Sequence, residues 1–380
     1  MRHSHLIIAC CVTASALATD RIVSPSGTYN TISSAIAASS DGDRILVMPG
    51  EYSGDIQVDK DLTLLPAVEG SRYFLSGTVR VSGGGTARRV VISGMHGGGF
   101  NTYGGTARLD VIITDSYFFG VDGYNYDVNG KHHIELYRDS VPNGVVFRSG
   151  SVIGCVIGGA ITVTQSAINL FGTTTLPDPV RVIGNELPYT GGYSGNSAYA
   201  IQLSASSVFQ IENNYVNVWG PSSKFIRVDG TPPFGQVTST ISNNLLRRYL
   251  GVSSAATILG TTANISVDVR NNATIGQTGV LVDWPYRTGG TSNNLSVDDA
   301  AINTTTGQPT GASALLNAGY ADPRYLDLDL TTNDVGCYGG SNSRANFTTG
   351  MGSAVVGFMQ APRVVSQGDP VNINASGFDR

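Results

Sequence analysis

Short apolar runs separated by Gly, Pro and Asn dominate the pattern of hydrophobic positions along the chain. The stretch "DGDRILVMPGEY", residues 41–52, places the apolar run "ILVM" between a Gly-centred break and a Pro-Gly turn. Further strands are predicted in "DIQV" and "KDLTLL", without the Asn-Gly signal of a β-hairpin between them. The pattern therefore predicts short strands that follow one another closely but are not paired as hairpins.

One helix is expected directly before the first of these strands. Ile32, Ala35 and Ile36 are spaced as one face of a helix, with Asn30 as the N-cap and Gly42 as the C-terminal stop. The helix is short and amphipathic, which suits a cap on the open end of a β structure.

A loose repeat runs through the second half of the chain. Apolar runs end in asparagine at intervals of 29, 30, 28 and 22 residues, at Asn185, Asn214, Asn244, Asn272 and Asn294. Periods of this length indicate stacked units, and an asparagine at the same corner of successive coils can form an amide ladder and adopt the left-handed backbone that a corner needs. Ordinary surface turns remain an alternative interpretation of these asparagines.

Composition agrees with a chain of strands and turns. The 48 glycines, the 13% of charged residues and the 41% of hydrophobic residues describe a folded protein with many tight turns. The net charge of −5, with no basic block, argues against a nucleic-acid partner, because neutralising phosphates needs clustered Lys and Arg.

The first eighteen residues are predicted to be a signal peptide, and the mature chain is expected to start at Thr19. Arg2, the apolar run "LIIACCV" and the Ala16-Leu17-Ala18 cleavage pattern carry this prediction, with an uncleaved capping strand as the alternative. The apolar run is too short to span a membrane. The remaining Cys155 and Cys337 imply no disulfide framework.

The helix, "DGDRILVMPGEY" and the Asn-punctuated strands together resemble the secreted right-handed parallel β-helix proteins of the pectin-lyase-like superfamily. The resemblance covers roughly residues 25–340. It implies an all-β, single-stranded parallel β-helix over residues 19–340 with an N-terminal cap helix, at the cell surface or secreted. Residues 341–380 are predicted to form two C-terminal capping strands around a Gln-Gly-Asp turn, or else to open a further domain.

The catalytic motifs of the pectin-degrading members of that superfamily are missing. In "SYFFG", Ser116 stands where a methylesterase of this superfamily would carry an acidic residue. The motifs of the polygalacturonases and pectate lyases are also incomplete or absent. Named pectinolytic chemistry is therefore disfavoured.

The stretch 122–140 concentrates histidines, charges and tyrosines in a chain that is otherwise poor in charge. As a strand it would place Lys131, His133 and Glu135 on one face. Lys131 or Arg138 would neutralise a uronate carboxylate, and His133 or a tyrosine would remove the C5 proton in a β-elimination. Tyr124 and Tyr126 would bind sugar rings. The alternative interpretation is a solvated loop that protrudes from the coil.

Two further sets of residues are candidates for binding. The oxygen ligands that Ca²⁺ prefers occur together at Asp327, Asp329, Asn333 and Asp334. An exposed strand face followed by a turn explains this pattern as well. Sugar stacking, or a corner packed by aromatic side chains, is expected at Trp284, Tyr286 and Arg287.

Two classes of function stay open at this point. The chain is expected to bind or cleave an acidic polysaccharide, as a lyase or another carbohydrate-active enzyme if it is catalytic. The alternative is a non-catalytic surface, fibre or adhesin component whose rigid rod is itself the function. The sequence leaves the oligomeric state open.

Overall fold

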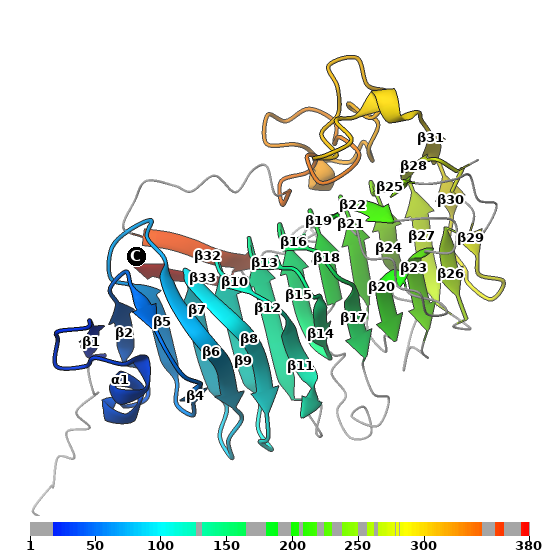
Figure 1. The fold of residues 1–380 in the computed structure, drawn as a ribbon. Coiled ribbons are helices and arrows are strands. Elements are labelled where there is room, and N and C mark those ends of the chain that lie inside the picture. Colours follow the sequence, from blue (N-terminus) through cyan, green and yellow to red (C-terminus); the bar gives the residue numbers. More distant parts are fainter. Residues whose placement is uncertain are drawn as a thin grey trace, which may run out of the picture.

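The computed structural model is a right-handed stack of coils with parallel strands on three faces (Figure 1). It describes residues 18–126, 131–164, 180–188, 199–204, 208–218, 224–229, 238–249, 257–261, 265–277, 279–280, 282–343, 354–360 and 374–379. Each coil contributes one strand to each face, and each strand pairs in parallel with its equivalents in the coils before and after it. The predicted parallel β-helix is confirmed.

The first face is a 12-stranded sheet, here called the long sheet. Its strands in spatial order are β1 (Asp20–Val23), β2 (Arg44–Val47), β5 (Leu62–Pro66), β7 (Arg88–Ser93), β9 (Leu109–Thr114), β12 (His132–Tyr137), β15 (Ser149–Ile153), β18 (Val180–Ile183), β21 (Phe209–Glu212), β24 (Thr238–Ser242), β27 (Ser266–Arg270) and β30 (Thr291–Ser292). The run "ILVM" lies in β2, but β1 precedes it and pairs with it, so β2 is the second strand of the sheet.

The other two faces follow the long sheet in every coil. The second face holds β3 (Glu51–Tyr52), β10 (Tyr117–Phe118), β13 (Ser140–Val141), β16 (Val156–Ile157), β19 (Glu186–Pro188), β22 (Tyr215–Val218), β25 (Leu245–Arg248), β28 (Ala273–Ile275) and β31 (Leu295–Ser296). The third face holds β4 (Ile56–Val58), β11 (Val121–Tyr126), β14 (Val145–Phe147), β17 (Ile161–Thr164), β20 (Tyr199–Ser204), β23 (Lys224–Asp229), β26 (Ile258–Gly260) and β29 (Val282–Asp283). The longer strands β6 (Tyr73–Ser82) and β8 (Met95–Tyr103) cross both faces.

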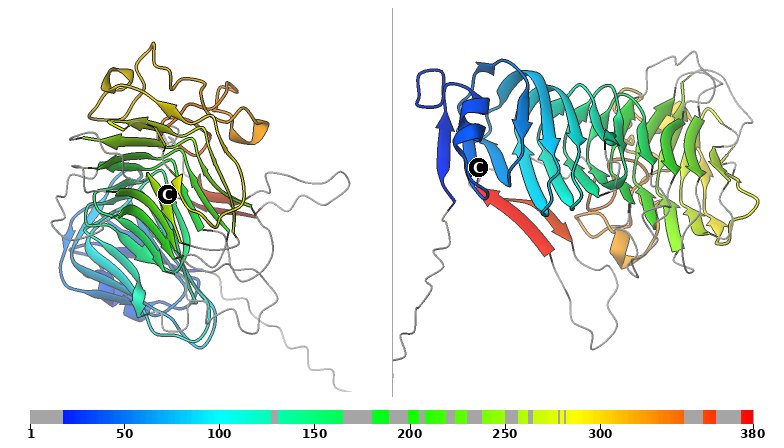
Figure 2. Two further views of the ribbon diagram at one scale, coloured as in Figure 1. Left: turned by 90° about the vertical axis from the view of Figure 1, so that its right-hand side faces the viewer. Right: turned by 90° about the horizontal axis from the view of Figure 1, so that it is seen from below.

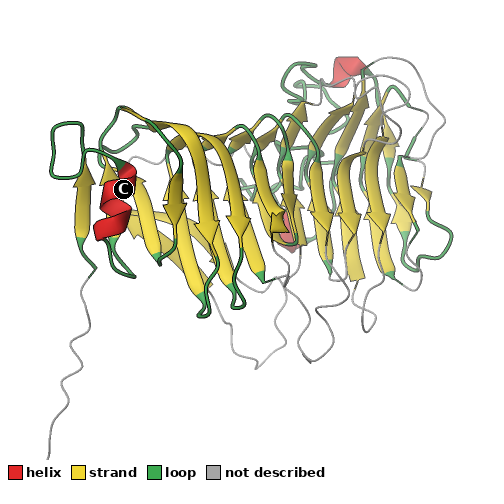
Figure 3. Cartoon of the chain, turned by 60° about the horizontal axis from the view of Figure 1, so that its bottom comes forward, coloured by secondary structure: helices red, strands yellow, loops and turns green. Residues whose placement is uncertain are grey.

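Among the described residues there is one α-helix, α1 (Ile32–Ala38), which closes the first coil (Figure 3). Its buried face is Ile32, Ala35 and Ile36, as predicted from their spacing. The N-cap is Thr31 and not Asn30, because the Thr31 hydroxyl accepts from the Ser34 N–H at 3.1 Å. The helix ends at Ala38, before the predicted stop at Gly42.

The C-terminal end of α1 is held by a lysine from the next coil. The Lys60 ammonium group donates to the carbonyls of Ile36, Ala37 and Ser39 at 2.8–3.1 Å. A cation at a helix C-terminus satisfies carbonyls that have no partner within the helix and interacts favourably with the helix dipole. This contact fixes the cap to the first strands.

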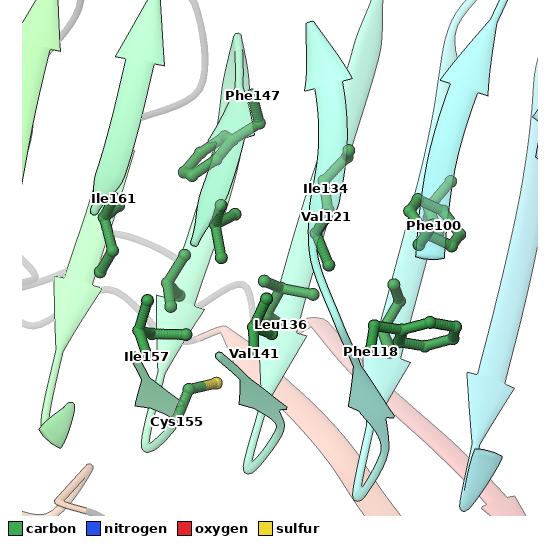
Figure 4. Packing of buried hydrophobic residues seen from close by; sticks show 14 of the residues in the cluster. Phe100, Phe118, Val121, Ile134, Leu136, Val141, Phe147, Cys155, Ile157 and Ile161 are labelled. Atoms are coloured by element: carbon green, nitrogen blue, oxygen red, sulfur yellow. The ribbon is translucent and has the colours of Figure 1, made fainter. Parts of the chain in front are cut away.

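One continuous apolar core fills the interior of the stack from α1 to the last coils. Figure 4 shows its middle part, where Phe118, Leu136, Phe147 and Ile157 from neighbouring coils pack against one another. Alternate residues of most long-sheet strands contribute to it, as the strand period of two requires. The residues between them point outward, and these carry the candidate chemistry.

The predicted asparagine ladder is confirmed at the corner between the long sheet and the second face. Each asparagine's backbone N–H donates to the side-chain oxygen of the next coil's asparagine at 3.0–3.1 Å, from Asn185 to Asn294. The side-chain amide groups bond along the same line at 2.9–3.1 Å. Asn185, Asn214, Asn244 and Asn272 have no exposed surface, so these bonds replace contact with water.

The ladder also extends through coils in which other residue types take the place of asparagine. The Met95 N–H donates to the Ser116 hydroxyl at 3.2 Å, and the Ser116 N–H donates to the Asp139 carboxyl group at 2.8 Å. The Asp139 N–H donates to the Cys155 sulfur at 3.4 Å. The Cys155 N–H in turn donates to Asn185 at 2.9 Å. Ser116, which stands where a methylesterase would have an acid, is therefore a buried ladder residue.

The left-handed backbone at this corner belongs to the residue before each ladder position. Asn213, Asn243, Asn271 and Asn293 have φ values of 52–57°, and the ladder asparagines that follow them do not have positive φ. The prediction that the ladder asparagines themselves adopt this conformation is wrong. One asparagine supplies the corner geometry and the next supplies the buried hydrogen bonds.

Asp139 is the one carboxylic acid in this ladder, and it is predicted to make stability depend on pH. Complete burial raises the pKa of Asp139 well above its usual value, although the N–H groups of Ser116 and Tyr137 partly oppose the rise. Because the folded pKa is raised, the stabilisation is complete below the unfolded pKa of about 4 and is lost as the pH rises toward the folded value.

Asp139→Asn should remove this dependence, because the amide has the shape of the neutral acid. Between pH 4 and pH 8 we expect the free energy of unfolding of the natural chain to fall relative to that of the variant, by at most about 1.4 kcal/mol per pH unit. The melting temperatures of the two proteins, measured across this range, report the difference. Parallel melting curves for the two proteins would contradict the assignment.

Residues 298–343 turn back and cover the second face of the last coils. Their apolar side chains pack on outward residues of β22, β25 and β28 in a separate cluster that consists of Tyr215, Leu245, Ala273, Ile275, Ile302, Leu315, Val335 and Cys337. The left-handed corner residues hold the segment: Asn213 bonds Asn333 at 2.7 Å, and Asn243 bonds the Tyr320 N–H at 2.9 Å. The 3₁₀ turns η2 (Asp299–Ala301) and η3 (Pro323–Tyr325) lie in this segment.

The C-terminal residues form an antiparallel pair, β32 (Ala354–Gln360) and β33 (Asn374–Asp379). The predicted first strand, in "PRVVS", and the Gln-Gly-Asp turn fall in 361–373, outside the described residues. The pair lies along the flank of the first half of the stack, away from the last coil (Figures 1 and 2). The proposed signal peptide also lies outside the described residues, apart from its last position.

Candidate functional site

The charged stretch 122–140 belongs to the stack and is not an inserted loop. Its residues form β11 and β12, and β12 pairs with β9 on one side and β15 on the other. Asp139 then takes the ladder position of that coil. The interpretation as a protruding loop is wrong because the stretch supplies a complete rung of the long sheet. Residues 127–130 lie outside the described part.

The predicted division of β12 into two faces is confirmed. Ile134 and Leu136 point into the core (Figure 4), while His133, Glu135 and Tyr137 point outward. His132 is buried with the inward set, where its ring bonds the Thr102 hydroxyl at 2.7 Å and the Gly104 carbonyl at 2.8 Å. His132 is therefore held as a structural residue at the edge of the core.

His133 is held between a hydroxyl and a carboxylate. Its Nδ1 lies 2.9 Å from the Ser149 hydroxyl on β15, and its Nε2 lies 3.2 Å from Glu135 Oε1. A carboxylate can only accept, so in the neutral imidazole the tautomer with its proton on Nε2 satisfies both contacts, and Nδ1 then accepts from Ser149. The side chains of His133 and Glu135 are 13% and 9% exposed, so little water competes for these bonds.

Tyr137 and Arg181 complete the group on the outward face, which we call the His133 cluster: His133, Glu135, Tyr137, Ser149 and Arg181. Burial, followed by the negative charge of Glu135, raises the pKa of Tyr137, while the charge of Arg181 opposes the rise. The phenol therefore stays protonated at neutral pH. The Arg181 Nε also donates to Gln210 at 3.3 Å, which holds the guanidinium group over the sheet.

The outer face around this cluster is largely shielded from solvent. Val91, Ile112, Tyr137, Ile153 and Ile183 form an outward apolar cluster whose members are only 4–8% exposed. Further along the sheet, Thr240 donates to the buried Glu212 carboxylate at 2.6 Å. The His133 cluster thus lies on a face where apolar and hydrogen-bonded polar residues are packed together. This packing strengthens the electrostatic interactions within the His133 cluster.

Of the other predicted catalytic residues, Lys131 and Arg138 flank the two ends of β12. Lys131 is exposed at the entrance to β12. The Arg138 guanidinium group binds Asp115 through two hydrogen bonds of 2.7 and 2.8 Å at the next corner. Tyr124 and Tyr126 belong to β11, but the positions of their side chains lie outside the described part of the structure.

The predicted aromatic patch is divided between core and surface. Trp284 is 4% exposed and belongs to the main core, where it packs on Gly260 and fills the end of the stack. Tyr286 is exposed, and Arg287 donates to the carbonyls of Val267 and Gly289 at 3.0 Å. Packing by aromatic residues, the alternative considered for this patch, describes Trp284.

The four residues predicted to bind Ca²⁺ each brace a turn. Asp327 accepts from the N–H groups of Asp334 and Gly340, Asp329 accepts from Thr331, and Asp334 accepts from the Asn317 N–H. Asn333 bonds Asn213. The described residues contain no group of three or more His, Cys, Asp or Glu side chains that could hold a metal. Calcium binding here stays a prediction.

Sequence reasoning missed Ser149 and Arg181. Ser149 lies 16 residues after His133 and Arg181 lies on the following coil, whereas the later coils repeat every 28–30 residues. The coil length is irregular here, so the register that brings these strands together cannot be read from a fixed period. Alignment of the corner positions Asp139, Cys155 and Asn185 would have revealed it.

Comparisons with known proteins add no name to this site. No family model, no curated protein and no solved structure matches the chain. In the part of the chain that the structure describes, no helix is long and apolar enough to cross a membrane. The geometry of the His133 cluster is therefore the basis for a function.

Proposed function

We propose that the protein is a secreted or cell-surface relative of the pectin-lyase-like proteins that binds an acidic polysaccharide on the outer face of β12, β15 and β18 and breaks a bond in it. The observation that carries this proposal is the His133 ring, which is held between Ser149 and Glu135 and lies on the same face as Arg181. A base fixed by an acid, with a cation nearby, is the combination that chemistry on a uronate needs.

Four members of the His133 cluster have a role in this proposal. His133 accepts the proton, and Glu135 orients its ring and stabilises the imidazolium form. Arg181 takes the part predicted for Lys131 or Arg138 and neutralises the carboxylate of the sugar. Tyr137 remains protonated and can donate to developing negative charge. In β-elimination, these groups would remove the proton next to the carboxylate and stabilise the resulting anion.

A non-catalytic scaffold is the second candidate, and the burial of the cluster favours it. Counted over the whole residue, Glu135 and Tyr137 are only 7% and 4% exposed, and the ladder makes the stack a continuous rod. In that case the contacts of His133 would only join neighbouring coils. The two functions differ in whether removing the imidazole changes an interaction with polysaccharide.

His133→Ala should abolish the interaction, and His96→Ala is its matched control. His96 is a partly exposed histidine on the second face, away from the cluster. The natural chain and His96→Ala should be retarded in native gels that contain alginate, pectate or a glycosaminoglycan. They should also raise the absorbance of an unsaturated product if elimination occurs. His133→Ala should lower turnover at least about 100-fold. No retardation by any of these polymers would favour the scaffold.

A further inference from the structure

The hydroxyl of Ser149 faces the acceptor nitrogen of His133, which an eliminating base does not require. Proton abstraction from a sugar needs only the imidazole, whereas Ser149 lies at 2.9 Å from Nδ1 and Glu135 at 3.2 Å from Nε2. A hydroxyl, a base and an acid in this order are the arrangement of a nucleophile activated by an oriented base. The strand period places His133 and Glu135 on one face, and the pairing of β12 with β15 places Ser149 opposite His133.

The backbone beside Ser149 is held in an unusual conformation. Gly150 has a φ of 135°, a region that residues with a side chain rarely adopt, and a Cβ at this position would lie 1.7 Å from the Ile134 carbonyl oxygen. Glycine adopts this conformation without a steric cost, and it also allows β12 to approach this closely. The residue that follows Ser149 is therefore held against β12.

A second hydroxyl lies next to this group without a hydrogen-bond partner. Ser151 pairs with Glu135 on one side and Arg181 on the other in the strand register, so the three share the outward column. Its Oγ is fully buried and has no partner among the residues that the structure describes. Unsatisfied buried hydroxyls are uncommon. Ser151 and Arg181 are therefore donors available for an oxyanion.

We propose that Ser149 is the nucleophile of an ester hydrolase site, with His133 as general base and Glu135 as the positioning acid. The substrate class is an acyl or alkyl ester carried by the acidic polysaccharide, so the identity of the polymer rests on the function proposed above. The fold alone does not imply this chemistry. The contacts of Ser149, His133 and Glu135 support it.

The reaction consists of two acyl transfers and involves no oxidation. Ser149 Oγ forms a bond to the ester carbonyl carbon as its proton moves to His133. The bond from that carbon to the alkoxy oxygen then breaks, and His133 returns the proton to the leaving alcohol. Water attacks the acyl-serine with His133 again as base, which releases a carboxylic acid and regenerates the Ser149 hydroxyl. Ser151 and Arg181 would stabilise the oxyanion in both halves.

Labelling with diisopropyl fluorophosphate tests the nucleophile directly. The reagent phosphorylates an activated serine with loss of fluoride, and mass spectrometry of the peptides locates the modification. We expect it on Ser149 in the natural chain and in the control Ser140→Ala, which removes a partly buried serine of the second face. Ser149→Ala should abolish labelling, and His133→Ala should slow it at least about 100-fold. Each variant's melting temperature is compared with that of the natural chain to confirm folding.

Acid release from acetylated and methyl-esterified pectin, measured in a pH-stat, tests the substrate. Ester hydrolysis that Ser149→Ala loses and Ser140→Ala keeps supports the proposal. Polymer binding without labelling of Ser149 overturns the nucleophile but leaves the proposed function standing. Labelling of Ser149 without binding or hydrolysis of any polymer supports Ser149 as the nucleophile and overturns the assignment of a polysaccharide ester as the substrate. Elimination product from the Ser149→Ala variant at the natural rate also overturns the ester reaction.

Discussion

Asn214→Ala should lower the free energy of unfolding by about 3 kcal/mol or more, the largest loss expected from a single side chain of the ladder. The Asn214 side chain accepts from the N–H and the side-chain amide of Asn185 at 3.1 and 2.9 Å, and donates to the Val182 carbonyl at 2.8 Å and to Asn244 at 2.9 Å. Alanine would leave the buried Asn185 N–H without its acceptor, which costs about 1–3 kcal/mol, and it would remove three further buried hydrogen bonds. Thermal melting followed by circular dichroism measures the effect.

Asn294→Ala is the control, because the same side chain at the end of the ladder is partly exposed. Asn294 accepts two bonds from Asn272 and donates to Val269 at 3.2 Å, and water can replace part of this set. We expect less than half of the loss seen at Asn214. Equal effects at the two positions would mean that burial does not decide the strength of the ladder.

Gly150→Ala should prevent folding or lower the stability by more than about 4 kcal/mol. With φ at 135°, the added Cβ would project along the sheet toward β12 and meet the Ile134 carbonyl oxygen at 1.7 Å. Relieving this clash requires β12 and β15 to separate. That separation breaks the backbone hydrogen bonds that pair the two strands and moves Ser149 away from His133. Soluble yield and melting temperature are the measurements.

The matched control is Gly311→Ala, at a glycine without positive φ whose Cβ would meet no atom within 4 Å. This variant should fold with nearly unchanged stability, within about 0.5 kcal/mol, as most surface substitutions do. A stable Gly150→Ala protein with an unchanged melting temperature would show that β15 can shift, and that the close approach of β12 does not require glycine beside Ser149.

The fold could be predicted because one residue type repeats at one structural position. Asn185, Asn214, Asn244 and Asn272 all satisfy the same buried N–H, so the spacing of this residue reports the coil. In earlier coils the same N–H bonds an oxygen or sulfur of another residue type, at Ser116, Asp139 and Cys155. Because any acceptor of similar reach serves, the sequence pattern disappears there although the structure continues.

The site could be predicted only within a single strand. The period of two placed His133 and Glu135 on the outer face, and the structure brings them within 3.2 Å. Ser149 and Arg181 come from later coils, so their positions depend on the length of the intervening chain and the resulting register. For Trp284 the sequence left sugar stacking and core packing open, because only the structure shows that this large aromatic side chain lies in the core beside Gly260.

The corner ladder has a direction, and this direction bears on how the chain is made. Every backbone N–H along it, from Met95 to Asn272, takes its acceptor from the coil that comes later in the sequence. A coil that emerges during synthesis therefore completes the one before it and waits for its successor, and coils contact only their neighbours. We therefore expect the nascent stack to grow coil by coil from α1 onward, with a single incomplete rung at its leading edge.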